Sequence, residues 1–171
     1  MTMGRLWDKY MGTLPAAAGA AALPTTELRA ALLALDGAGV EFGVREAGGG
    51  GADLVAEWKV LEPATGSGLN RRQVQRTFKI WMRFVPAERE VRAMDEQWAV
   101  TLAGPAPGRA VRRERGRGPI RSVQKQWTLE RGPDGRRRKV ETFSLDTQDM
   151  KDPLRQAVVG SGWGWRGVLR L

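Results

Sequence analysis

Apolar and polar residues alternate over most of residues 40–146, which is the pattern of strands that bury one face. The alternating runs predict three pairs of strands, at residues 40–44 and 54–60, 78–84 and 94–102, and 119–130 and 140–145. Four glycines separate the first pair and the turn Gly132-Pro133-Asp134-Gly135 separates the third. Because every connection is short, successive antiparallel hairpins are the simplest topology.

Two segments have helical rather than strand periodicity. Residues 25–36 follow Pro24 and carry Leu28 and Leu32 on one face, and Gly37 is placed to end the helix. Residues 153–160 form the second segment, for which Asp152 is the expected cap and Pro153 the first turn. A last strand is expected around Trp163 and Trp165, which would lie on the same face and seal the fold.

Together these elements predict an α+β fold: a bent antiparallel sheet or partly closed barrel of six to seven strands, covered by the two helices. The 171 residues suffice for one core, so we expect a single domain over residues 25–171. Residues 1–24 are expected to form an N-terminal arm, with a short helix pinned by Trp7 and an Ala-rich linker. Residues 62–76 and 103–118 lack apolar periodicity and are expected to be long mobile loops.

Most large aromatic residues fall on the expected apolar faces of their strands. Those assigned to the core in this way are Trp58, Trp98, Trp127 and Phe143. Trp81 lies on the opposite face, between Lys79 and Arg83. If that face meets solvent, Trp81 is a stacking platform for single-stranded nucleic acid; if a helix covers it, Trp81 belongs to the core.

The charge of the chain favours an anionic partner. The sequence has 28 Lys and Arg against 19 Asp and Glu, a net charge of +9. The candidate polyanion-binding residues are Arg71, Arg72, Lys79, Trp81, Arg83, Arg109, Arg112, Arg113, Arg115, Arg117, Arg121, Arg136, Arg137, Arg138 and Lys139. Guanidinium groups bind phosphate oxygens in a forked geometry and release counterions. The alternative is a set of solvated loops, in a protein whose Arg, Ala and Gly contents reflect a GC-rich coding sequence.

The absence of two residue types removes much chemistry. The sequence has no Cys, which excludes disulfides and thiolate sites, and no His, which excludes imidazole-based catalytic pairs and the usual zinc sites. Asp146, Asp149 and Asp152 are spaced by three, but they fit helix capping better than acid–base catalysis. No catalytic residue, metal site or cofactor is therefore predicted, and a non-catalytic role is favoured over an enzyme.

No run approaches the roughly 20 apolar residues of a membrane span, and a cytoplasmic protein is expected. The function that the sequence favours is non-catalytic binding of a polyanion through Arg-rich loops, with nucleic acid the first ligand and acidic lipid the second. The alternative is a scaffold or assembly subunit with no nucleic-acid role. Its loops and termini would contact a protein partner or form a homo-oligomer.

Overall fold

The computed structural model describes residues 3–171, in which three α-helices and eight strands are found. The helices are α1 (Met3–Met11), α2 (Thr25–Leu33) and α3 (Gln148–Gly160), and short 3-10 turns occur at Gly68–Asn70 and Pro86–Glu88. The strands are β1 (Gly43–Gly49), β2 (Ala52–Leu61), β3 (Arg72–Val85), β4 (Glu90–Ala103), β5 (Arg109–Arg117), β6 (Val123–Arg131), β7 (Arg137–Asp146) and β8 (Gly164–Gly167). The α+β class is confirmed.

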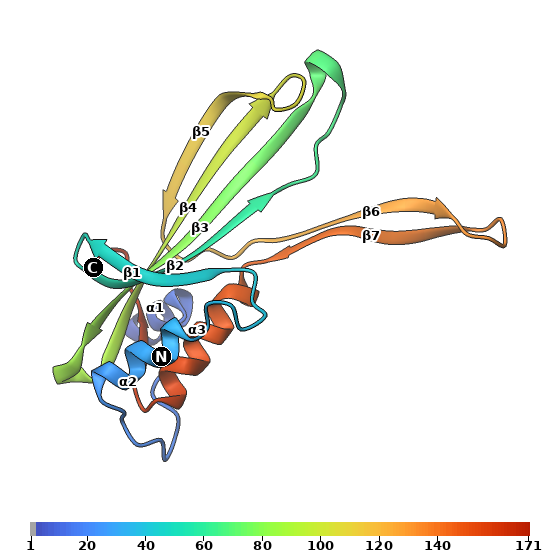
Figure 1. Cartoon of the computed structure of the whole chain (residues 1–171). Coiled ribbons are helices and arrows are strands. Elements are labelled where there is room, and N and C mark those ends of the chain that lie inside the picture. The colour runs from blue at the N-terminus through green and yellow to red at the C-terminus, as the bar shows by residue number, and fades with distance from the viewer. Residues whose placement is uncertain (1–2) are drawn as a thin grey trace.

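The strands form two sheets (Figure 1). The larger has six strands, with the order β1-β2-β3-β4-β5 and with β8 parallel to the first residues of β4. The three expected hairpins are present, but the third, β6–β7, forms a separate sheet and leaves the main body. The main sheet is not closed, so the barrel alternative is wrong.

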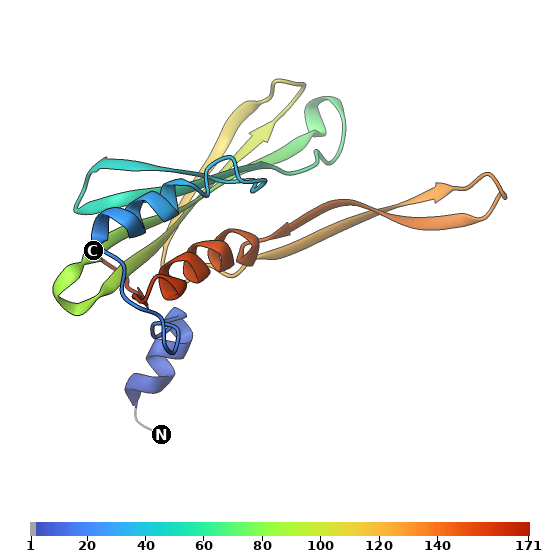
Figure 2. The same ribbon diagram turned by 60° about the horizontal axis from the view of Figure 1, so that its bottom comes forward.

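One face of the main sheet, which we call the inner face, packs on α2 and α3 (Figure 2). Strand β3 places Phe78, Ile80 and Met82 on this face, as the alternation predicted. Leu32 of α2 and Leu154 of α3 are fully buried against it. Burial of each such side chain contributes about 1.5–3 kcal/mol, so this layer is the main source of stability.

The last strand closes the core from the end of the sheet. Trp163 and Trp165 are both buried, as expected for residues that seal the fold. The Trp163 indole N–H donates to the carbonyl of Leu23 over 2.8 Å, and Trp165 forms an isolated bridge with Leu14. Residues near both ends of the chain therefore meet at β8.

Helix α3 begins earlier than predicted. It starts at Gln148, whose backbone N–H donates to the Asp146 carboxylate over 2.9 Å. Pro153 consequently lies inside the helix, and the prediction that Asp152 caps it is wrong. The sequence signal failed because a proline can also stand beyond the first turn when packing holds the helix around it. Helix α2 also differs from its prediction, since it ends at Leu33.

The second of the two predicted mobile loops is largely strand, whereas residues 62–71 of the first lie outside the strands. Residues 72–76 begin β3, and residues 109–117 form β5. Strand β5 has no apolar alternation because it pairs with β4 along one edge and exposes nearly all its side chains. Periodicity detects a buried face, so a strand that buries neither face leaves no such signal.

The hairpin β6–β7, which we call the arm, projects from the body (Figures 1 and 2). Leu145 at its root is buried and Phe143 packs against the core. Beyond these residues both faces of the arm are exposed, with Trp127 46% and Leu129 68% accessible. The prediction that Trp127 lies in the core is therefore wrong, because no second layer covers its face within residues 3–171.

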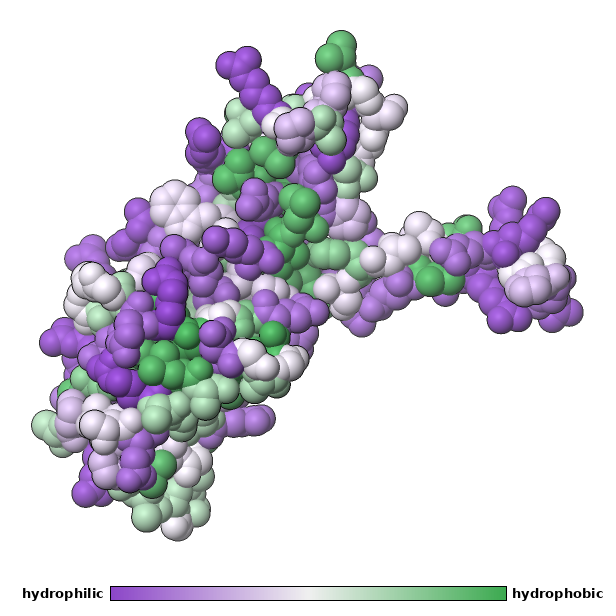
Figure 3. Space-filling model, viewed as in Figure 1, coloured by the Kyte–Doolittle hydropathy of each residue, from purple (hydrophilic) through white to green (hydrophobic). Residues whose placement is uncertain are grey.

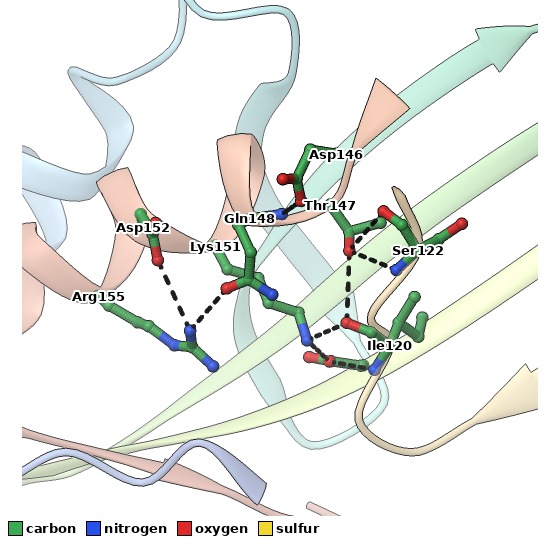
Figure 4. A network of polar contacts seen from close by, with 9 residues as sticks. Ile120, Ser122, Asp146, Thr147, Gln148, Lys151, Asp152 and Arg155 are labelled. Atoms are coloured by element: carbon green, nitrogen blue, oxygen red, sulfur yellow. Dashed lines mark hydrogen bonds and ion pairs between the residues drawn. The ribbon is translucent and has the colours of Figure 1, made fainter. Parts of the chain in front are cut away.

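A buried polar cluster fixes the root of the arm to the body (Figure 4). The Lys151 ammonium pairs with the carboxylate of Asp95 on β4 and donates to the carbonyl of Ile120 over 2.5 Å. Asp95 also accepts the Ile120 backbone N–H over 3.0 Å. Just after β7, the Thr147 hydroxyl accepts the backbone N–H of Ser122, which directly precedes β6, over 3.0 Å. The cluster thus joins α3, the sheet and both ends of the arm.

Helix α1 is not pinned by Trp7, which is 51% exposed. Met11 at its end is buried instead, and the hydroxyl of Thr13 accepts the backbone N–H of Gly167 over 3.3 Å. The helix in fact contacts the body at its C-terminal end.

Candidate functional site

The face of the main sheet opposite the helices, which we call the outer face, carries two tryptophans. Trp81 lies there as predicted, and no helix covers it within the described residues. Trp98 pairs with Thr77, so it shares this face, and its assignment to the core is wrong. The face of Trp98 was predicted wrongly because β4 carries apolar residues on both faces, with Val91 and Ala93 on the inner face and Trp98 on the outer face.

A buried glutamate organises the centre of the outer face. The Glu96 carboxylate accepts the indole N–H of Trp81 over 3.1 Å and that of Trp98 over 2.6 Å. It also pairs with Arg115 at 3.0 Å and with Arg117 at 3.7 Å. Burial opposes ionisation of Glu96, but the Arg115 guanidinium and the two indoles outweigh it and hold its pKa below the ordinary value. Glu96 is therefore an ionised anchor for four side chains.

Cations lie over both tryptophan rings. The Lys79 ammonium is 5.5 Å from the ring centroid of Trp81, and the Arg115 guanidinium is 4.6 Å from that of Trp98. Trp81 is half-buried and Trp98 is 36% exposed. A base that stacks on these rings must therefore compete with a cation, whereas a phosphate meets the cations directly.

A second glutamate lies at the other side of the outer face. Glu57 contacts the ammonium groups of Lys59 and Lys79, both at 3.1 Å. Burial raises the pKa of Glu57, but the two lysines outweigh it and hold the value below the ordinary one. Arg83 extends the basic character along β3, where it lies opposite Arg92 and is exposed.

The predicted arginines between residues 109 and 117 form an ordered row along β5. Arg113, Arg115 and Arg117 pair with Val100, Trp98 and Glu96, so all three lie on the outer face. Arg109 and Arg112 pair with Ala103 and Thr101, so they lie on the opposite side of this strand, toward its start. This strand is at the edge of the sheet, where positive charges also discourage pairing with other chains.

Arg71 and Arg72 adjoin one end of this row. Arg72 pairs with Ala103, which pairs in turn with Arg109. The backbone N–H of Gly104 donates to the carbonyl of Arg71 over 3.0 Å. The first residues of β3 and β5 therefore form one basic end of the sheet.

The remaining predicted cations lie on the arm, apart from β5 (Figures 1 and 3). Arg136 and Arg137 are exposed near its tip, and Arg138 pairs with Asp134 at 3.0 Å. Lys139 lies 4.1 Å from the ring centroid of Trp127. Arg121 is at the root of the arm. The predicted residues thus divide into two basic surfaces, the β5 row with the outer face and the tip of the arm.

Sequence reasoning missed Glu96 and Tyr10. Glu96 gave a weak signal, since it is a charged residue between Met94 and Trp98 on an otherwise apolar face of the strand. No sequence signal marked Tyr10 beyond its place in an amphipathic segment. In the structure Tyr10 lies beside the end of β5.

Comparisons of the chain with protein-family models, with curated proteins and with solved structures found no match. Within residues 3–171, no helix is long and apolar enough to cross a membrane. The same residues contain no group of three or more acidic side chains placed to hold a metal ion.

Proposed function

We propose that this protein binds nucleic acid without catalysis, and that β5 is its principal contact. The observation that carries the proposal is the row of five arginines within the nine residues of β5. Alternate residues of a strand lie roughly 7 Å apart, so Arg113, Arg115 and Arg117 offer a regular series of guanidinium groups to successive phosphates along one side of the strand. Arg109 and Arg112 lie on the other side of the same edge. Arg71, Arg72 and Lys79 extend the same basic surface.

Nucleic acid is favoured over an acidic lipid surface by the shape and content of this region. The arginines follow a line along one strand edge, and aromatic rings lie beside the outer-face members of the row. A basic track with neighbouring aromatics is typical of single-stranded nucleic-acid binders. A lipid surface requires no such track, only a basic patch.

The test is a salt titration of binding to a labelled single-stranded oligonucleotide. The variant is Arg112→Gln with Arg113→Gln, because neither side chain contacts Glu96. The matched control is Lys9→Gln with Arg89→Gln, which removes the same charge from exposed positions outside the strands, in α1 and in the turn between β3 and β4. If both arginines of the variant contact phosphates, the slope of log K against log salt falls by about 1.4, since each contact contributes about 0.7 on a single strand.

The control is expected to keep the slope of the wild type. Equal losses in the two variants would show that only net charge matters. Binding that does not depend on salt would contradict the proposal, and binding to acidic vesicles alone would move it to lipid.

A second candidate function is a role in assembly, and the arm favours it. Two-stranded hairpins are marginal in water, and this one exposes Val123, Trp127 and Leu129 on the same face. A protein partner would cover that face. Light scattering after size exclusion tests this: an oligomer free of nucleic acid, which Trp127→Ser with Leu129→Ser dissociates, supports assembly over nucleic-acid binding.

A further inference from the structure

A groove of about 620 Å³ lies between α1 and the end of β5. Trp7 and Tyr10 contribute from α1, and Arg117 and Arg121 from the end of β5 and the loop after it. Ile120 and Leu169 add apolar surface. The volume falls in the range of small-molecule sites, and the lining combines aromatic rings with guanidinium groups.

Helix α1 presents its apolar stripe to this groove and to solvent. Met3, Leu6, Trp7 and Tyr10 have the spacing of one helical face, and all are more than half exposed. The helix is held instead by its last turn and the segment that follows, where the backbone N–H of Leu14 donates to the carbonyl of Trp165 over 2.7 Å. A stripe of this kind is normally turned inward, so its aromatic members are available for a ligand.

We propose that the groove binds one nucleotide unit, whose base stacks on Tyr10 or Trp7 and whose phosphate binds Arg121 and Arg117. The two rings are 5.8 Å apart and tilted by 39°, so they do not lie flat against each other. Arg121 is exposed and forms no ion pair within the described residues, so its guanidinium is available to a phosphate.

The charges around the groove favour this ligand over an apolar one. Three arginines line it, of which Arg115 and Arg117 also pair with Glu96 and Arg121 forms no ion pair within the described residues. The single carboxylate of the lining, that of Glu114, is paired with Arg112. Base stacking and phosphate pairing together use both kinds of lining residue. The inference rests in part on the proposed function. Ala99 and Glu114 of the lining lie on the side of the sheet opposite Trp98 and Arg115, so a strand bound along β5 reaches the groove by passing round this edge of the sheet.

Two probes distinguish a free nucleotide from one nucleotide of a strand: adenosine monophosphate and a labelled oligoadenylate. The variants are Tyr10→Ala and Trp7→Ala, made separately and together in the full chain. Leu6→Ala is the matched control, because it removes an exposed apolar side chain from the same helix outside the groove lining. Thermal unfolding checks that each variant remains folded.

The double variant is expected to weaken binding of at least one probe on the order of tenfold, because stacking on aromatic side chains is lost. Leu6→Ala is expected to leave binding unchanged. Weaker binding of adenosine monophosphate assigns a free nucleotide, and weaker binding of oligoadenylate alone assigns a unit of a strand. Arg121→Gln is expected to weaken binding of the same probe.

Failure of the groove and failure of the proposed function give different results. If Arg112→Gln with Arg113→Gln weakens oligoadenylate binding and the aromatic variants do not, the groove assignment is overturned and the β5 surface stands. If the aromatic variants alone weaken binding, the groove stands without β5. Binding of neither probe, or aromatic-dependent binding to acidic vesicles only, overturns the inference.

Discussion

Leu54 in β2 and Leu129 in β6 belong to strands with the same alternation, but Leu54 is fully buried and Leu129 is 68% exposed. The difference lies outside the strands. Helices α2 and α3 cover the inner face of the main sheet, whereas nothing within residues 3–171 covers the arm beyond its root. Alternation therefore indicates which side of a strand is suited to burial, and the rest of the fold decides whether that side is buried.

The largest expected effect concerns the cluster that joins the two regions. Lys151→Met leaves the Asp95 carboxylate buried without its cation, so we expect a loss of about 3–5 kcal/mol in the free energy of unfolding, measured with urea. Lys125→Met is the control, since its ammonium is on the exposed arm. Similar small losses in both variants would mean that the root of the arm is not fixed by this ion pair.

A matched pair of substitutions tests the difference between the buried face of the main sheet and the exposed arm. Leu54→Ala opens a cavity in the core and is expected to cost about 2–5 kcal/mol in urea unfolding. Leu129→Ala is expected to change stability by less than about 0.5 kcal/mol. A large loss for Leu129→Ala in the isolated protein would show that the arm packs against something in solution.

A smaller effect is expected on the outer face, where Glu96 is buried without a covering helix. Glu96→Gln removes the charged hydrogen bonds to Trp81, Trp98 and Arg115, at an expected cost of about 1–3 kcal/mol at pH 7. Because the pKa of Glu96 is lowered in the folded state, its stabilisation is present above the ordinary value of about 4.3 and disappears as the pH falls through the folded value.

The gap in stability between the wild type and Glu96→Gln should therefore narrow below about pH 4. Urea unfolding at a series of pH values measures it. A gap that stays constant in acid would mean that the charge of Glu96 does not stabilise the fold.

A small effect on stability is also expected from shortening the arm. Replacing residues 127–142 with Asn-Gly joins Gln126 to its cross-strand partner Phe143 and keeps the buried root. We expect the free energy of unfolding to change by less than about 1 kcal/mol, because the removed residues are almost all exposed. If oligonucleotide binding weakens while stability holds, the tip of the arm contributes to the interface; unchanged binding restricts the interface to the main sheet.

The sequence was sufficient to predict the three hairpins and the buried face of β3, because each has a turn signal or a clear alternation of apolar and polar residues. It was not sufficient for β5, which pairs through its backbone while its side chains remain in solvent. It also failed for Trp98, because β4 is apolar on both faces and only pairing with β3 shows which side meets the helices.

For the candidate site, composition identified the arginines but not their arrangement. The row on β5 and the tip of the arm are indistinguishable as sequence, since both are runs of Arg with a few acidic residues. The strand register distinguishes the two runs. Arg115 and Arg117 form ion pairs with Glu96, whereas Arg136 and Arg137 are exposed on the arm. Such contacts join residues far apart in the chain, which local patterns do not describe.

The position of β8 bears on how the protein is made. During synthesis β4 can pair with β3 early, but its first residues lack their neighbour on the other side until residues 164–167 leave the ribosome. Leu14 likewise has no bridge partner until this strand is synthesised, because it pairs with Trp165. A nascent chain that stalls before residue 163 would thus expose an unpaired stretch of β4 and the core surface that Trp163 and Trp165 cover, and such a chain would be prone to aggregation.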